Sequence, residues 1–120
     1  GGGSYRSAIR DGLRVLIAVA RADGYLDAKE VDVIMDYARA EGARKGVTGD
    51  EAALGELRSY VERLQPSGSV VASCIDRLTE EGEETQKNIL AYLEKVIKAD
   101  GVIDGSEAEL EMLIAKRLER

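Results

Sequence analysis

A nine-residue acidic segment occurs twice in this chain, and the repetition limits the folds available to it. ADGYLDAKE at residues 22–30 returns 77 residues later as ADGVIDGSE at residues 99–107. Each copy follows a stretch with leucines at helical spacing and precedes another amphipathic stretch, so the repeated unit is a helix, a short turn and a second helix. The corresponding leucines are Leu13 and Leu16 in the first copy and Leu90 and Leu93 in the second. The sequence therefore predicts two αα-hairpins of one pattern.

Apolar residues recur every three or four positions along nearly the whole chain, which is the spacing of one helix face. We expect helices over about residues 9–23, 28–43, 54–64, 70–82, 83–99 and 105–118. Pro66, the only proline, should end the third of these, because its ring disfavours helical geometry in the preceding residue. No six-residue window alternates like a strand. The predicted fold is all-α, a compact bundle of about six to seven helices with an internal pseudo-repeat.

Length and composition are those of one small globular domain. The chain has 120 residues, of which 44% are hydrophobic and 33% charged. The start, GGGS at residues 1–4, is read as a flexible linker or a cloning scar, so residues 5–120 form the expected single domain. No apolar run approaches the ~18 residues that a bilayer crossing needs, and the start does not resemble a secretory signal. We therefore expect no direct membrane insertion.

The ionisable residues exclude several classes of function. Lys and Arg number 17 against 23 Asp and Glu, a net charge of −6 that argues against nucleic acid or anionic lipid as the main partner. There is no histidine, so Ser-His-Asp and Cys-His catalysis and imidazole metal ligation are excluded. Cys74 is the single cysteine, which rules out a disulfide within the chain and suits a reducing cytoplasm. We expect Cys74 to be a core residue and the protein to be cytoplasmic.

One interpretation of the repeated segment is purely structural. Gly24 and Gly101 stand where a helix C-terminus favours a left-handed residue, which glycine adopts without steric cost. The aspartates three residues further on, at 27 and 104, are then N-caps of the next helix. A glutamate follows each aspartate after three residues and completes a variant of the capping box. Losing such a cap typically costs about 1 kcal/mol, so folding alone is one sufficient reason for this motif.

A second interpretation starts from Asp23 and Asp100, which are expected at the end of a helix. There the negative end of the helix macrodipole disfavours a carboxylate by roughly 0.3–1 kcal/mol. Clustered carboxylate oxygens are the ligands that hard cations such as Ca²⁺ or Mg²⁺ prefer. The motif is not an EF-hand, because Val19 and Arg21 stand where two of its ligands belong, so a complete site requires the two copies to face each other or a partner to complete it. The candidate ligands for a divalent cation are Asp23, Asp27, Glu30, Asp100, Asp104 and Glu107.

The doubled motif, ADGYLDAKE at Ala22 to Glu30 and ADGVIDGSE at Ala99 to Glu107, resembles the TerB-like family of tellurite-resistance proteins. The same signature occurs in the N-terminal region of DjlA-type membrane-anchored co-chaperones. The resemblance covers about Ile9 to Leu118 and implies a compact helical bundle whose acidic motif residues gather at the surface as a divalent-metal site. It also implies a role in tellurite or other chemical stress. Many such domains are modules of larger proteins, so a protein partner or parent chain is expected, and association with a membrane would come through that partner.

Three classes of function follow from these residues. The first is a non-enzymatic binding module whose acidic turns hold a divalent cation or a cation-dependent partner. The second is a helical protein-interaction module in which the acidic motif acts only as helix caps. The third, an enzyme that uses paired carboxylates as acid and base, is disfavoured, and we assign no catalytic residue.

Overall fold

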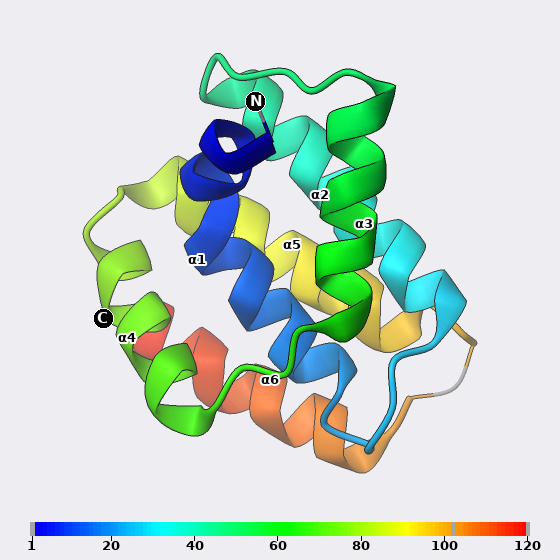
Figure 1. Ribbon diagram of the computed structural model, residues 1–120. Coiled ribbons are helices and arrows are strands. Elements are labelled where there is room, and N and C mark those ends of the chain that lie inside the picture. The colour runs from blue at the N-terminus through cyan, green and yellow to red at the C-terminus, as the bar shows by residue number, and fades with distance from the viewer. Residues whose placement is uncertain (1, 102, 120) are drawn as a thin grey trace.

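The computed structural model describes residues 2–101 and 103–119, and within this part of the chain all regular structure is helical. Six helices follow one another around a single core (Figure 1): α1 (Gly2–Ala20), α2 (Ala28–Arg44), α3 (Glu51–Arg63), α4 (Gly68–Thr79), α5 (Glu83–Lys98) and α6 (Gly105–Leu118). The prediction of an all-α bundle is confirmed. None of these helices is long and apolar enough to cross a membrane.

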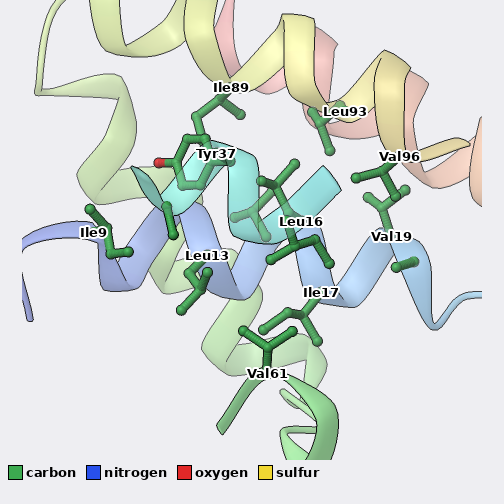
Figure 2. Packing of buried hydrophobic residues seen from close by; sticks show 14 of the residues in the cluster. Ile9, Leu13, Leu16, Ile17, Val19, Tyr37, Val61, Ile89, Leu93 and Val96 are labelled. Atoms are coloured by element: carbon green, nitrogen blue, oxygen red, sulfur yellow. The ribbon is translucent and has the colours of Figure 1, made fainter. Parts of the chain in front are cut away.

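Helix α1 is the centre of the bundle and contacts each of the other five helices. The second half of the helix explains this position, because every residue from 15 to 20 is apolar and this part has no polar face. Leu13, Leu16, Ile17 and Val19 are completely buried. Figure 2 shows these residues pointing in different directions, toward α2, α3 and α5. The bundle is therefore built around its first helix.

Local signals set most helix boundaries where the sequence predicts them. Ser67 follows Pro66 and caps α4 by accepting a hydrogen bond from the backbone N–H of Val70 at 3.3 Å. The aspartate at position 50 caps α3 in the same way, at 2.8 Å from the N–H of Ala53. This second cap was not predicted, although an aspartate directly before a helical stretch is a typical signal.

The first helix begins earlier than expected. Residues 2–4 were predicted to lie outside the fold as a linker, but α1 starts at Gly2. Its first turn leads into Tyr5, a buried side chain whose hydroxyl donates a hydrogen bond to the carbonyl oxygen of Ala38 in α2 at 2.8 Å. This anchor holds the beginning of α1 on the bundle. Gly1, the other residue of the predicted linker, lies outside the described residues.

Candidate functional site

The two copies of the acidic segment form the α1–α2 and α5–α6 connections, and both connections lie at the same end of the bundle (Figure 1). Each connection turns through a glycine with positive φ, +107° at Gly24 and +82° at Gly101. Residues with a side chain rarely adopt this backbone conformation. The predicted role of these glycines is confirmed, and the turns bring acidic residues of both copies together.

Both predicted N-caps are present, but only the first forms a complete capping box. The Asp27 side chain accepts a hydrogen bond from the N–H of Lys29 at 2.8 Å, and Glu30 Oε1 accepts one from the N–H of Asp27 at 2.9 Å. Asp104 caps α6 by accepting from the N–H groups of the two residues at 106 and 107. The side chain of Glu107 instead reaches the first copy of the motif.

Glu107 and Glu30 form a buried pair of carboxyl groups. Each residue is only 2% exposed, and the Glu107 carboxyl hydrogen-bonds with those of Glu30 and Asp23. A hydrogen bond between two carboxyl groups requires a proton on one of them. The pKa of Glu107 is raised to about 9. Burial is the largest cause, and the negative charge of Glu30 and its hydrogen bond come next. At neutral pH, Glu107 therefore holds the proton and donates a hydrogen bond to the Glu30 carboxylate.

Glu30 is the acceptor in this pair. Burial raises its pKa as well, and the negative charges of Asp23 and Asp100 act in the same direction. The N–H of Asp27 and the hydrogen bond from Glu107 oppose this effect by stabilising the ionised form. Two carboxyl groups thus share one proton at the junction of the two turns.

The remaining predicted ligands occupy different positions around this pair. Asp23 is half-buried, and its Oδ1 accepts a hydrogen bond from the N–H of Tyr25 at 3.2 Å. Asp100 is exposed and contributes negative charge to the site. Asp27 and Asp104 are held by their capping bonds. The structure thus brings Asp23, Glu30 and Glu107 into contact and leaves the two caps beside them.

Oxygen donors of this kind match the preference of Ca²⁺ and Mg²⁺. Across residues 2–101 and 103–119, however, no group of three or more Asp, Glu or Cys side chains is spaced to hold a metal ion. The carboxyl groups face one another through a shared proton, so a cation would have to displace that proton. The carboxyl oxygens of Asp23, Glu30 and Glu107 are therefore of the right kind for a hard cation. In this structure, however, they are arranged around a shared proton and not around an ion.

A second buried acid, Glu41, was not singled out from the sequence. It is 1% exposed and accepts two hydrogen bonds from Arg44, at 2.7 Å from Nε and 2.8 Å from Nη2. Burial favours the neutral acid, but the hydrogen bonds and positive charge of Arg44 outweigh it and lower the pKa of Glu41. Arg44 also hydrogen-bonds Thr85 of α5. This ion pair ties α2 to α5 and is structural.

The one cysteine lies in the core, as predicted. Cys74 is fully buried in α4, and Arg77 Nη2 lies 3.5 Å from its sulfur. Burial and the neighbouring Asp11 raise the pKa of the thiol, which keeps it protonated and unreactive. Cys74 is therefore no part of the candidate site.

Comparison of the chain with protein-family models, curated proteins and solved structures found no match. The resemblance to TerB-like proteins rests on the doubled motif and stays a prediction. The candidate site is consequently defined by its own geometry, namely the buried carboxyl groups that join the two turns.

Proposed function

We propose that this protein is a non-enzymatic binding module whose two acidic turns together take up a divalent cation. The observation that supports the proposal is the burial of Glu30 and Glu107 against each other, with Asp23 in contact. A pair of buried acids is unfavourable for folding unless a proton or a cation compensates the charge. A folding role alone explains the caps at positions 27 and 104. It does not explain why the side chain of Glu107 reaches from the α5–α6 turn to the α1–α2 turn.

Asp23, Glu30 and Glu107 are the residues that would hold the cation, with Asp100 adding negative charge from the surface. When bound, the ion would neutralise the carboxylates and join the two turns more firmly than a shared proton does. Binding requires the three carboxyl groups to turn toward one point. Asp27 and Asp104 would position the site through their capping bonds and would not be its main ligands.

The wider role that we propose is that of a TerB-like module in the response to tellurite or related chemical stress. The doubled ADGxxDxxE pattern supports this assignment. The net charge of −6 disfavours direct capture of an oxyanion, so the protein would act through its bound cation or through a partner.

The test is a residue-resolved amide NMR titration of the full chain with Ca²⁺, Mg²⁺, Mn²⁺ and Zn²⁺. We expect saturable shifts confined to residues 21–31 and 98–108 for one of the hard cations, together with a rise in the melting temperature. A titration in which no cation moves these amides would contradict the proposal.

Two variants make the titration specific. Glu107→Gln keeps the shape of the side chain and its ability to donate a hydrogen bond, but it removes a ligand, so the cation response should be lost while the apo fold remains. Glu109→Gln, an exposed glutamate on the same helix, is the matched control and should leave the response unchanged. A full cation response with both Asp23 and Asp100 changed to Asn would also contradict the site as drawn.

A second candidate function is a helical protein-interaction module in which the acidic segments only support the fold. It is favoured by the capping bonds of Asp27 and Asp104 and by two large apolar side chains, Met112 and Leu113, that are 68% and 57% exposed on α6. A flat cation titration combined with binding through α6 would select this function over the first.

A further inference from the structure

Helix α6 carries apolar side chains on more than one face. Ile114 and Leu118 are buried against the bundle, whereas Met112 and Leu113 are largely exposed. With 3.6 residues per turn, neighbouring residues lie about 100° apart, so Met112 and Leu113 cannot share the direction of Ile114. A surface helix that needs only its own bundle is apolar on one stripe. The outer side of α6 therefore has the composition of a helix that packs against a further surface.

A groove with a basic rim lies between α6 and α4. It has a volume of about 710 Å³, and Val71, Ile75 and Leu110 contribute to its apolar lining. Its charged lining residues are all cations: Arg21, Lys116 and Arg117. Arg117 also pairs with Asp76 at 2.6 Å, and Arg21 donates to two backbone carbonyl oxygens, but none of the charged residues that line the groove is acidic. The groove therefore favours an apolar surface that is edged with carboxylates.

A groove with an acidic rim lies on the other side of α6, toward α5. It has a volume of about 570 Å³, and Leu90 and Met112 contribute to its apolar lining. Its acidic lining residues are Glu94, Glu109, Glu111 and Glu119. Burial and the charge of Glu94 raise the pKa of Glu111, although Lys98 opposes this, and the four glutamates of the lining outnumber its one cation, Lys116. Leu113 and Lys116 border both grooves.

The two grooves are complementary to each other, because both are apolar and their rims carry opposite charges. A two-fold axis parallel to α6 brings the outer faces of two copies of this helix together and places opposite edges of the helix in contact. A two-fold axis perpendicular to α6, within the contact plane, places like edges in contact and sets acid against acid. Only the parallel arrangement satisfies both rims at once.

We propose that a second copy of this chain covers α6, with the two α6 helices side by side and parallel. The exposed Leu113 of each copy then enters the acidic-rimmed groove of its partner, and the cations of each basic rim face the partner's glutamates. This surface is separate from the acidic turns, and the proposal does not depend on cation binding.

The first test is sedimentation velocity on the full chain in chelator-containing buffer, over a concentration series that reaches the millimolar range. We expect the mass to rise from the monomer value of 13.0 kDa to twice that value. Leu113→Asp should hold the protein at the monomer mass. Ile103→Asp is the matched control, since Ile103 is similarly exposed (59%) but borders neither groove, and it should dimerise normally.

Two outcomes of this experiment would overturn the proposal. One is a single 13.0 kDa species at every concentration, the result expected if a different protein covers α6. The other is a dimer that Leu113→Asp does not weaken. Circular dichroism of each variant ensures that a change in mass is not caused by unfolding, which is not expected at an exposed position.

The second test addresses the parallel arrangement. Lys116→Glu and Glu119→Lys each place like charges across both halves of a symmetric dimer, so each should weaken self-association about tenfold. Mixed in equal amounts, the two variants restore opposite charges at both contacts and should form a mixed dimer as tightly as the unaltered chain does. If mixing does not restore association, the parallel arrangement is wrong.

Discussion

The hydroxyl group of Tyr37 lies directly over the backbone of Gly12, where any other residue would place its side chain. A β-carbon on Gly12 would lie 1.9 Å from Tyr37 Oη and 2.5 Å from Ile89 Cδ1. Glycine at this position lets α1 approach α2 and α5 closely, and α1 can be the centre of the bundle only with such approaches. Glycine lowers the stability of a helix when it stands in the middle, but at position 12 it is needed because a larger residue would not fit.

Replacing Gly12 with alanine should therefore destabilise the protein. Alanine is favoured over glycine inside helices by up to about 1 kcal/mol, but overpacking a core costs about 1–3 kcal/mol, and the clash should decide the sign. Gly55→Ala is the control, because a β-carbon on this glycine of α3 would meet no packed neighbour within 4 Å, and the change should stabilise the protein. Urea denaturation measures both effects. Equal stabilisation by the two changes would mean that Tyr37 moves aside freely.

Stability should fall with rising pH because of Glu107. Its pKa is raised from 4.5 to about 9, so the folded state binds the proton more tightly than the unfolded state does. The stabilisation is fully present below pH 4.5 and is lost as the pH rises through 9. Glu107→Gln should remove this slope and raise the free energy of unfolding at pH 8 by about 1–3 kcal/mol. The measurement is denaturation at several pH values without divalent cations, and a slope that Glu109→Gln removes equally would contradict it.

Removing Arg44 should expose the cost of burying Glu41. Arg44→Met leaves that carboxylate with Lys45, at 4.0 Å, as its neighbouring cation and should cost about 2 kcal/mol. The pKa of Glu41 is lowered, so its ion pair stabilises the protein above pH 4.5, and this stabilisation is lost as the pH falls through the folded-state pKa. In Arg44→Met, acid unfolding should begin at a higher pH.

The control for this change lies on the same helix. Arg39 pairs with Asp36 at 3.1 Å, but both side chains are more than half exposed. Arg39→Met should therefore change the free energy of unfolding by less than about 0.5 kcal/mol. If Arg44→Met and Arg39→Met lower the free energy of unfolding equally, burial of Glu41 does not strengthen its ion pair with Arg44.

The contribution of Asp27 and Asp104 as helix caps can be measured separately from the contribution of their negative charge. Asp27→Ala and Asp104→Ala should each cost about 1 kcal/mol, because a side-chain acceptor for the first turn is lost. Asparagine is as good an N-cap as aspartate, so the corresponding Asn variants should remain within about 0.3 kcal/mol of the parent chain. Thermal unfolding of the four variants tests this, and a large loss in the Asn variants would show that the negative charge itself stabilises the turns.

The sequence was sufficient for the helix order because helix ends are set by local signals. Pro66 and the caps at positions 27 and 104 act within a few residues, so their effects can be read without a structure. The contact of Glu30 with Glu107 depends instead on how the two hairpins pack, which spacing along the chain does not determine. Glu41 could have been noticed, since it follows Ile34 and Ala38 on one face of α2 at helical spacing. The early start of α1 had no such signal, because glycine does not favour a helix.

The central position of α1 also affects the order in which the protein can form. Synthesis proceeds from the N-terminus, so α1 leaves the ribosome before any helix that covers it. Of the six helices, α5 and α6 are made after the others, and both contact α1 directly. Until then α2, α3 and α4 cover only part of α1, and chaperones that recognise apolar segments can bind the side that α5 and α6 will cover.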